Sequence, residues 1–419
     1  MTRLDRMVLE VGPNDLHKLD RLPASLRLAA FIISRLKKGR LDMVLPDGRT
    51  LRFTGQQPGL HAELIVHDLT FIRPVLAKGD IGFAEAFMDQ KFDTPDLATL
   101  LRYFNDNWED ADRLVIGNAV ARFFIGLRHM MRANTKKGSK RNILAHYDLG
   151  NDFYTRWLDP TMTYSSALFS SEDQSLRDAQ VAKYRSIAEN LKLKPGDHVL
   201  EIGSGWGGFA EVAGKEYGAR VTSITISDAQ HAYATKRIAD AGLADKVEIV
   251  MCDYRDVKGQ FDAVASIEMF EAVGEEYWPG YFGKIADVLK PGGRAALQII
   301  TIDDKYFDLY RRRADFIQHY IFPGGMLPSE RRLREETAAV GLGFAVDKMF
   351  GLSYARTLSE WAKRFDQEWD HIKGGKFDEA FRRLWLYYLA YCEAGFRTRR
   401  IDVGQFVLTK TCLASPSSC

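Results

Sequence analysis

A glycine-rich turn is the part of the sequence whose spacing points most directly to chemistry. Residues 197–210 read DHVLEIGSGWGGFA, in which Gly203, Gly205 and Gly208 form a G-x-G-x-x-G pattern after a short apolar run. Glycines lack a Cβ, so the backbone can pass close to a ligand at the start of a helix. The pattern alone also fits a dinucleotide site. Glu201 favours a cationic or amine-bearing ligand, because a carboxylate there would repel a pyrophosphate.

The next apolar stretch of the sequence ends in polar residues. Thr225 and Ser227 end the stretch ARVTSITIS (residues 219–227), and Asp228 and Gln230 follow it. A dinucleotide enzyme would place one ribose-binding acid at this distance from the glycines. This chain offers hydroxyls and an amide as well as an acid.

A third apolar run ends in a pair of residues suited to an adenine ring. Asp253 and Tyr254 come directly after Cys252. The carboxylate can accept hydrogen bonds from the edge of an adenine, and the aromatic ring can stack on its face. The three run ends together therefore indicate an adenine nucleoside as the ligand.

An open parallel sheet would bring these run ends to one edge, where ligands bind in doubly wound folds. The run before Gly203 and the two runs described above predict the first three strands. Residues 261–269 and 293–302 predict a fourth and a fifth, with the turn KPGG (290–293) between helix and strand. The arrangement resembles the α/β class I S-adenosylmethionine-dependent methyltransferase fold, a Rossmann-like doubly wound sheet.

The composition narrows the classes of function. A chain of 419 residues suggests two domains, or one domain with large insertions. Its 58 basic and 56 acidic residues give a net charge of +2, which argues against a nucleic-acid partner. The 4 cysteines lack metal-ligand spacing, so we predict no metal site and a reducing, cytoplasmic environment. No apolar run approaches the roughly 18 residues of a membrane span, so any membrane contact is expected to be peripheral.

Residues 1–120 predict a small α+β domain. A helix is expected at 26–36, and alternating strands around Pro46-Asp47-Gly48 predict a hairpin over residues 41–53. Residues 62–66 and 71–76 are expected to continue the sheet, and helical segments follow at 81–88 and 97–104. No catalytic residue is expected in this domain.

A basic segment follows this domain. Residues 121–141 carry seven positive charges and no acid, and apolar residues alternate with the first three charges. The charged residues are Arg122, Arg128, Arg132, Lys136, Lys137, Lys140 and Arg141. A basic amphipathic helix followed by a basic loop is typical of contact with a membrane surface. A helix packed between domains and followed by a solvated linker is the alternative interpretation.

Two aromatic-rich regions flank the predicted sheet. Residues 142–169 are rich in Tyr, Asp, Trp and His and predict a lid over the sheet edge, with Asp148, Asn151 and Asp152 capping a helix. Residues 308–328 and 358–392 are expected to be mostly helical, with aromatic side chains that suit a long apolar guest, and 405–410 to form a closing strand. The following list gives the aromatic residues of the last helical region: Trp361, Phe365, Trp369, Phe377, Phe381, Trp385, Tyr387 and Tyr388.

Eight motifs occur in an order typical of one family. They are HYDLGNDFY, DPTMTYSSALF, VLEIGSGWGG, TSITIS-x-x-Q, DYRD, MFEAVG, HYIFPGGMLPS and GFRTRRIDVGQFV. With them the sequence resembles the cyclopropane-fatty-acyl-phospholipid synthases and the related mycolic acid cyclopropane synthases. The resemblance implies an enzyme that uses S-adenosylmethionine to place a one-carbon bridge across a cis double bond of a membrane phospholipid's acyl chain.

The resemblance also implies how the chain is organised. Residues 1–120 look like the lipid- or membrane-associated domain of the phospholipid-acting members, and 121–141 would be a basic linker. Residues 142–419 would form the methyltransferase domain with helical acyl-chain-binding insertions. A homodimer in contact with unsaturated phospholipids at the inner face of the membrane is implied as well.

A proton-accepting cluster is the next implication of the resemblance. In the family the base is thought to be a bound bicarbonate held by a few polar groups. By motif, Glu271 matches the glutamate of that cluster, Tyr354 its tyrosine and Ile300 its backbone contact.

This chain departs from the family pattern in the same cluster. Ser166 replaces a cysteine, Ala272 and Gln298 each replace a histidine, and Glu268 stands where glycine is common. Ser166 and Gln298 can still donate hydrogen bonds to an anion. The lost histidines and the added carboxylate weaken the case for bicarbonate, so we hypothesise that Glu268 or Glu271 accepts the proton directly.

The residues that the resemblance assigns to S-adenosylmethionine come from the lid and from four strand ends. They are Tyr147, Tyr164, Ser165, Gly203, Gly205, Thr225, Gln230, Tyr254, Arg255 and Ile267.

Three other functions stay open from the sequence. The same chemistry with a different proton loss would give a methyl- or methylene-branched acyl chain. A methyltransferase for a small soluble nucleophile would share the cofactor motifs, although it would need neither the basic segment nor the aromatic helices. A non-catalytic lipid-binding partner would keep the fold without methyl transfer.

Overall fold

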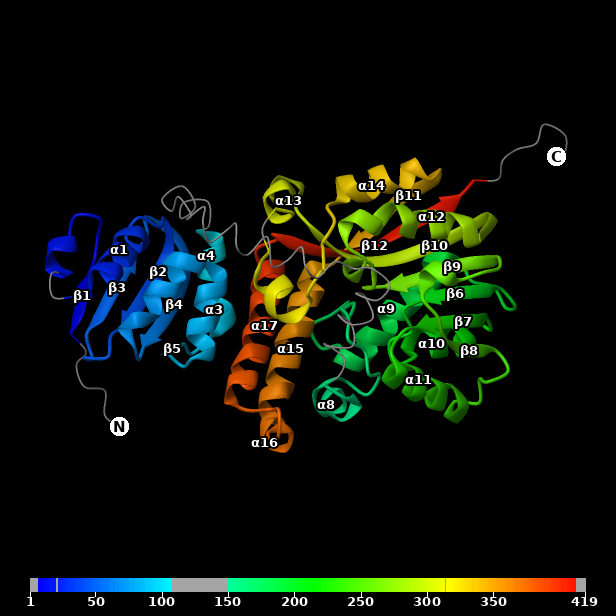
Figure 1. Cartoon of the computed structure of the whole chain (residues 1–419), viewed down its shortest axis with the longest axis horizontal. Helices are drawn as coiled ribbons and strands as arrows, with labels where there is room; N and C mark the ends of the chain where they lie inside the picture. The colour runs from blue at the N-terminus through cyan, green and yellow to red at the C-terminus, as the bar shows by residue number, and fades with distance from the viewer. Residues whose placement is uncertain (1–6, 20–21, 108–148, 313, 412–419) are drawn as a thin grey trace. The chain divides into compact units, whose positions relative to one another are not determined.

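The computed structural model describes residues 7–19, 22–107, 149–312 and 314–411 (Figure 1). These residues form two compact units. Unit 1 holds the described residues up to 107 together with 314–319 and 369–398, and unit 2 holds 149–312, 320–368 and 399–411. The basic segment 121–141, and with it the predicted domain boundary, lies outside the described residues. Both therefore stay predictions.

Unit 1 is built on a five-stranded sheet in the order β1-β3-β2-β4-β5. Its strands are β1 (Val8–Glu10), β2 (Lys38–Val44), β3 (Thr50–Thr54), β4 (Gln57–Val66) and β5 (Phe92–Asp93). β2 and β3 pair antiparallel, which confirms the hairpin predicted around Asp47 and Gly48, and β4 runs parallel to β2. The first helices are α1 (Ala24–Ile33), α2 (Ile72–Lys78), α3 (Asp80–Met88) and α4 (Leu97–Asp106).

The strand predicted at 71–76 is wrong, because these residues form a 3₁₀ turn (Leu69–Phe71) and helix α2. The Asp68 side chain accepts a hydrogen bond from the Thr70 backbone N–H and so caps the turn. Pro74 lies in the first turn of α2, where its missing N–H removes no helical hydrogen bond. The spacing of apolar residues in 71–76 is compatible with a strand, but the Asp68 cap and Pro74 are typical of the start of a helix.

Unit 1 also contains helices from the end of the chain. α16 (Trp369–Ile372) and α17 (Glu379–Arg397) belong to it, although residues 142–419 were predicted as one methyltransferase domain. The Tyr387 ring lies 6.5 Å from that of Phe83 and 6.0 Å from that of Phe87. Arg383 donates hydrogen bonds to the carbonyls of Phe87 and Phe92. Part of the aromatic set expected around an acyl chain therefore packs in the core of unit 1.

Unit 2 contains a seven-stranded sheet in the order β11-β12-β10-β9-β6-β7-β8. Its strands are β6 (His198–Ile202), β7 (Arg220–Thr225), β8 (Val247–Met251), β9 (Phe261–Ile267), β10 (Leu289–Ile302), β11 (Leu342–Met349) and β12 (Ile401–Lys410). β6 to β10 are parallel, as predicted, and β12 lies antiparallel between β10 and β11. The KPGG sequence is not a turn before the fifth strand, because β10 begins at Leu289 and its register with β9 shifts between Leu289 and Arg294.

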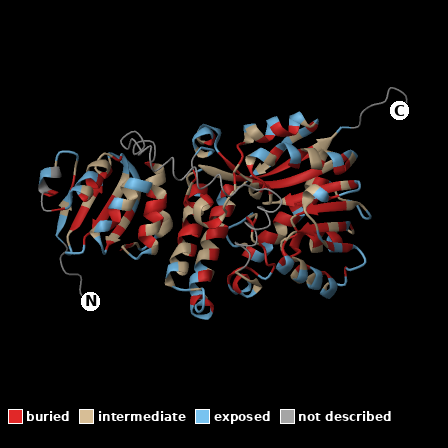
Figure 2. Ribbon diagram, in the orientation of Figure 1, coloured by how far each residue is buried: buried red, intermediate tan, exposed pale blue. Residues whose placement is uncertain are grey.

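Helices cover both faces of this sheet, and Figure 2 shows its strands largely buried. One face is covered by α9 (Leu176–Leu191), α10 (Gly208–Glu216) and α11 (Asp228–Asp240), and the other by α12 (Trp278–Val288) and α14 (Glu330–Ala339). Phe209 and Ile238 belong to the first core, while Tyr281 and Leu333 belong to the second. The two cores hold the strand ends in place and confirm the doubly wound α/β class.

Three further helices belong to unit 2, namely α8 (Asn151–Trp157), α13 (Asp304–Tyr310) and α15 (Gly351–Gln367). A π-helical turn at Ile317–Ile321 spans the division between the two units. The predicted helical stretch 308–328 is thus only partly helical. Among the described residues, no helix combines the length and the apolar character needed to cross a membrane.

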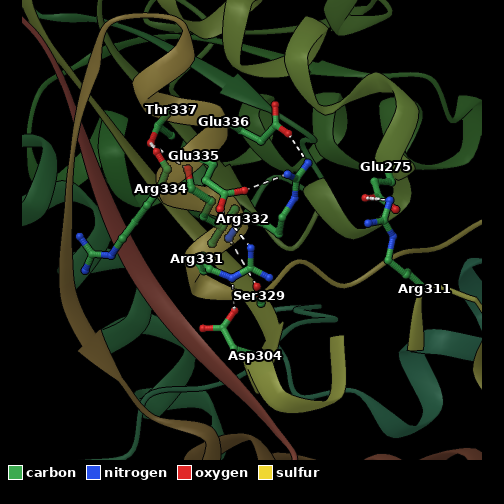
Figure 3. A network of polar contacts seen from close by, with 11 residues as sticks. Glu275, Asp304, Arg311, Ser329, Arg331, Arg332, Arg334, Glu335, Glu336 and Thr337 are labelled. Atoms are coloured by element: carbon green, nitrogen blue, oxygen red, sulfur yellow. Dashed lines mark hydrogen bonds and ion pairs between the residues drawn. The ribbon is translucent and has the colours of Figure 1, made fainter. Parts of the chain in front are cut away.

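An arginine-rich surface on α14 is neutralised by acids of the same unit (Figure 3). Arg332 donates to Glu336 at 2.6 Å and Arg334 to Glu330 at 2.7 Å, each pair spaced i,i+4. Arg331 contacts Glu335 at 3.1 Å. Exposed pairs of this kind contribute about 0.3–0.5 kcal/mol each. The arginines therefore stabilise the helix and do not form an unpaired basic surface.

Candidate active site

The glycine turn joins β6 to α10 in left-handed backbone. Gly203 has φ +96° and Gly205 φ +49°, conformations that side chains with a Cβ rarely adopt. A Cβ at Gly205 would meet no described heavy atom within 4 Å, so the space beside the turn is open. A Cβ at Gly208 would lie 2.5 Å from the Tyr184 hydroxyl oxygen, so this glycine lets α10 pack on α9. The turn has the open side that a nucleoside ligand requires.

A buried acid ends the strand before this turn. Glu201 Oε2 accepts a hydrogen bond from the Ser223 hydroxyl at 2.5 Å. Burial raises the pKa of Glu201 to about 8, with Ser223, Arg237 and Lys183 opposing the shift. A bound ammonium group would favour the ionised carboxylate. The acid thus suits the amine-bearing ligand expected from the sequence.

The ends of β7 and β8 carry the next predicted cofactor residues. The Thr225 hydroxyl donates to Gln230 Oε1 at 3.0 Å, so these two buried side chains orient each other. Arg255 contacts Asp253 through two hydrogen bonds of 2.8 and 2.7 Å, and its guanidinium lies 5.4 Å from the centre of the Tyr254 ring. The structure therefore places hydroxyl, amide, carboxylate and aromatic groups at adjacent strand ends.

The lid is tied to the glycine turn by a contact that the sequence did not reveal. Gly150 is the N-cap of α8 and no side chain caps this helix, so the predicted capping by Asn151 and Asp152 is wrong. Asn151 Oδ1 instead accepts a hydrogen bond from the Trp206 indole N–H at 2.9 Å. The Tyr154 ring lies 5.0 Å from the Trp206 ring. Tyr147 and Asp148 lie outside the described residues.

An aromatic wall continues from the lid into α15. The Tyr164 ring lies 5.3 Å from that of Trp361 and 5.7 Å from that of Trp157. Trp361 in turn lies 6.2 Å from the Tyr354 ring. Both tryptophans are fully buried. These rings pack against one another and reach Tyr354, one of the predicted catalytic residues.

Glu268, just beyond β9, accepts hydrogen bonds from three neutral donors. Its Oε1 accepts from the Ser166 backbone N–H at 2.9 Å and from Gln298 Nε2 at 2.8 Å. Its Oε2 accepts from the Tyr354 hydroxyl at 2.7 Å. Ser166, Gln298 and Tyr354 are buried, whereas Glu268 is half-buried. The three donors form a cradle for one carboxylate, and we call Ser166, Gln298 and Tyr354 the anion cradle.

The backbone of Glu268 is left-handed, with φ +51°. This conformation costs a residue with a Cβ roughly 1–2 kcal/mol relative to glycine. The Glu268 N–H donates to the Gln298 carbonyl at 2.8 Å, which holds the residue in place. The strained backbone directs the carboxylate into the anion cradle.

Glu271 is held in a different way. Its Oε1 accepts a hydrogen bond from the Ile300 backbone N–H at 2.6 Å. Its Oε2 is shielded from solvent and has no hydrogen-bond partner among the described residues. Burial, together with the negative charge of Glu268, raises the pKa of Glu271 to about 8. Glu271 is therefore mainly protonated at neutral pH.

Lys183 is a functional candidate that the sequence analysis missed. It is fully buried in α9, and its Nζ donates to the Ser165 hydroxyl oxygen at 2.6 Å. Burial lowers the pKa of Lys183 to about 7, and the charges of Glu268, Asp159 and Glu201 oppose this change. One feature of the sequence could have revealed Lys183: Gln180 and Lys183 are polar residues spaced i,i+3 on a mostly apolar helix face. Gln180 is also buried, and it donates a hydrogen bond to the Ser165 carbonyl.

Of the two predicted anion donors, Gln298 behaves as expected and the Ser166 side chain does not. Ser166 binds Glu268 through its backbone N–H, and its hydroxyl donates to the Ala167 carbonyl at 2.9 Å. Gln298 does donate to the carboxylate, and its own Oε1 accepts from Gln405 Nε2 at 3.2 Å. The structure thus brings all five predicted catalytic residues to one edge of the sheet. The last predicted cofactor residue, Ile267, ends β9 and pairs with Gln298.

Comparison with known proteins identifies the family. The profile described as mycolic acid cyclopropane synthetase matches residues 134–406. The chain is 36% identical to the tuberculostearic acid methyltransferase UfaA1 of Mycobacterium tuberculosis over 88% of each chain. It is also 36% identical to the cyclopropane-fatty-acyl-phospholipid synthase of Escherichia coli K12, over 83% of this chain and 88% of the relative. The mycolic acid cyclopropane synthase CmaA1, solved with SAH and CTAB, is 30% identical with a TM-score of 0.60 over 65% of this chain and 98% of its own. The chain therefore belongs to the mycolic acid cyclopropane synthetase family and is an S-adenosylmethionine-dependent methyltransferase of the cyclopropane synthase type.

Proposed function

We propose that this enzyme transfers the methyl carbon of S-adenosylmethionine to a cis double bond of an unsaturated phospholipid acyl chain and closes a cyclopropane ring. The observation that carries the proposal is the pair of acids beyond β9, Glu268 and Glu271, whose hydrogen-bond donors are neutral groups. Burial raises the pKa of both carboxyl groups, so they keep their affinity for protons. The relative from Escherichia coli, a cyclopropane-fatty-acyl-phospholipid synthase by name, supports the substrate class.

The residues at the glycine turn and the strand ends are suited to bind S-adenosylmethionine. S-adenosylmethionine supplies an electrophilic methyl carbon when it is bound. The open side of Gly205 and the buried acid Glu201 suit its nucleoside and its ammonium group. We assign its binding to the lid and strand-end residues Tyr147, Tyr164, Ser165, Gly203, Gly205, Thr225, Gln230, Tyr254, Arg255 and Ile267.

The chain's own residues must meet three demands of this reaction. Bonding of a new carbon to an alkene leaves positive charge on the acyl chain, which water would trap. The buried rings of Trp157 and Trp361 exclude water, and the faces of aromatic rings stabilise a nearby cation. Ring closure then needs an acceptor for one proton from the added carbon. The anion cradle supports such an acceptor beside the aromatic wall.

A methyl-branched product is the second candidate function. It is favoured by the match to UfaA1, a tuberculostearic acid methyltransferase by name, which is as similar to this chain as the cyclopropane synthase. Loss of the proton from a neighbouring carbon would leave a double bond and an added methyl branch. The two products are isomers of equal mass, and they differ in the number of deuterons that they retain from a methyl-deuterated cofactor.

We also propose peripheral contact with the inner face of the membrane and a homodimer. The seven positive charges of residues 121–141 support contact with anionic lipid. Sedimentation with anionic and neutral vesicles tests the membrane contact, and light scattering tests the dimer. Binding that is equal for both vesicle types would contradict the electrostatic basis.

The decisive experiment is mass spectrometry of phospholipid acyl chains after incubation with methyl-deuterated S-adenosylmethionine and vesicles containing cis-monounsaturated lipids. A saturated ring that retains two deuterons establishes cyclopropanation. A remaining double bond with three deuterons on a branch establishes the branching reaction. Binding of the cofactor with no modified lipid would contradict both and support a lipid-binding partner without catalysis. A soluble acceptor methylated in the absence of vesicles would identify a small-molecule methyltransferase.

A further inference from the structure

The two acids beyond β9 are held by different partners, and this difference separates their roles. We propose that Glu268 is the proton acceptor of the reaction and permanently occupies the anion cradle, so that turnover needs no dissolved bicarbonate. The inference rests on the proposed methyl-carbon transfer to an alkene. It selects one of the two acids that the sequence left as alternatives.

The anion cradle has the geometry of a site for a small carboxylate-like anion. Three donors from three parts of unit 2 converge on one carboxylate, at 2.9, 2.8 and 2.7 Å. Ser166 contributes from the lid loop, Gln298 from β10 and Tyr354 from α15. Bicarbonate carries the same pair of acceptor oxygens and would use the same donors. In this chain the Glu268 carboxylate takes that place.

The backbone at Glu268 indicates that this occupation is specific. A residue with a Cβ and φ +51° is strained at this position, whereas glycine would not be. Strained residues of this kind persist where the surrounding structure holds them, often in functional sites. At Glu268, three hydrogen bonds to the carboxylate offset the backbone strain. A substitution by glycine would relax the backbone and empty the cradle.

Glu271 does not suit the role of acceptor. It is mainly protonated at neutral pH, and its Oε2 lacks a partner among the described residues. Two nearby carboxylates do not ionise together easily in a site of low polarity. The protonated form of Glu271 is therefore the one that allows Glu268 to stay ionised. It also leaves an O–H group that could be directed toward the substrate.

Lys183 is a positioning residue for Glu268. Its ammonium group holds the Ser165 hydroxyl, and the next residue, Ser166, donates its N–H to Glu268. Its positive charge also favours the ionised form of Glu268. The groups facing Glu268 are therefore Ser166 from the lid, Lys183 from α9, Gln298 from β10, Tyr354 from α15 and Glu271 from its own loop.

The proton step is balanced with these groups. The ionised Glu268 takes one proton from the carbon newly bonded to the acyl chain. The electron pair of that C–H bond forms the second C–C bond and neutralises the cationic carbon. Glu268 is left as a neutral carboxylic acid, and it returns the proton to solvent after the product leaves.

The test compares Glu268→Gln and Glu268→Gly with the unchanged enzyme in buffer purged of carbon dioxide, with and without added bicarbonate or formate. The unchanged enzyme should turn over at the same rate in all buffers. Glu268→Gln should lose about 100-fold or more in kcat, the usual contribution of a general base, and added anions should not restore it. Glu268→Gly should lose as much, and bicarbonate or formate should restore part of the rate by filling the cradle.

Thermal unfolding provides a readout that does not depend on activity. Bicarbonate should raise the melting temperature of Glu268→Gly and leave those of the unchanged enzyme and Glu268→Gln unaltered. Glu276→Gln, a change at an exposed acid in the same region, is the matched control and should leave turnover unchanged. Cofactor binding by each variant, measured by calorimetry, verifies that it is folded.

Two results would overturn the inference. One is an unchanged enzyme whose rate falls when carbon dioxide is removed. The other is full turnover by Glu268→Gln. If the unchanged enzyme forms no product from unsaturated phospholipid, the proposed function fails instead, and anion-dependent stabilisation of Glu268→Gly still decides whether the cradle binds anions.

Discussion

A carboxylate in each unit accepts several hydrogen bonds, yet the two differ in proton affinity. In unit 1, Asp42 on β2 accepts from Arg52 at 2.8 and 3.0 Å and contacts His61 at 3.0 Å. In unit 2, Glu268 is bound by a backbone amide, a side-chain amide and a phenol. Burial opposes ionisation of both. The pKa of Asp42 is nevertheless lowered, because Arg52, His61 and Arg40 outweigh burial, whereas the pKa of Glu268 is raised.

The difference lies in the depth of burial as well as in the charge of the partners, because burial outweighs the stabilising groups at Glu268 but not at Asp42. An adjacent guanidinium stabilises a carboxylate so strongly that the acid no longer takes up a proton at neutral pH. Neutral donors favour the ionised form less strongly, and at Glu268 burial outweighs them, so its pKa is raised. A network of hydrogen bonds around an acid is therefore no sign of catalysis until the donors are identified. By this criterion Asp42 is a structural residue and Glu268 is suited to accept a proton.

The largest effect is expected for Glu268→Gln. Turnover should fall about 10²- to 10⁴-fold, because the amide cannot accept the proton. The free energy of unfolding should change little, since the amide oxygen can still accept from the cradle. Parallel assays of lipid product and urea unfolding check this separation. A large loss of stability with normal turnover in the folded fraction would assign Glu268 to the structural type.

Asp42→Asn should show the opposite pattern. We expect unit 1 to lose about 1–3 kcal/mol of stability, because Arg52 would lose its charged partner. Turnover of the folded protein should not change. Asp47→Asn is the matched control, because Asp47 also pairs with an arginine, Arg49, but is exposed. An exposed pair contributes about 0–1 kcal/mol. Equal losses in the two variants would show that burial of Asp42 is unimportant.

Lys183→Gln tests how a positive charge affects the proton affinity of Glu268, because it removes the α9 cation that lowers the pKa of this acid. The amide can still donate to Ser165, so the change mainly removes charge. Without that charge the pKa of Glu268 rises, and the acidic limb of the pH–rate profile should move to higher pH. We expect kcat at neutral pH to fall about tenfold, which corresponds to one pKa unit. An unmoved acidic limb with a lower kcat would make Lys183 a structural residue only.

The last prediction concerns the pH dependence of stability through Glu271. Its folded pKa of about 8 lies above the value of about 4.3 expected in the unfolded chain, so the folded state binds more protons between these limits. The stability from this group is fully present below about pH 4.3 and is lost as pH rises through 8. Glu271→Gln should therefore show a weaker decline in urea-unfolding free energy from pH 5 to 8.5. An identical decline would mean that Glu201, whose pKa is also raised to about 8, controls it.

Local patterns predicted much of the fold. The order of β6 to β10 followed from apolar runs that end in polar residues, and the hairpin of β2 and β3 followed from Asp47 and Gly48. Both depend on neighbours in sequence. The helix α2 was mistaken for a strand, because a short apolar stretch fits either form and only Asp68 and Pro74 distinguish them. The place of helix α17 in unit 1 could not be predicted, since its aromatic side chains do not indicate which core they enter.

The sequence by itself determined the glycine turn, the residue types at the strand ends and the presence of two acids near the end of β9. Those features depend on residue chemistry and on spacing within one segment. Only the tertiary structure decided which acid is held by three donors and which buried cation acts on it. Ser166, Gln298 and Tyr354 come from separate elements, and their hydrogen bonds to Glu268 exist because the packing of the sheet and its helices brings distant segments together. The same packing places Lys183 where its charge acts on Glu268.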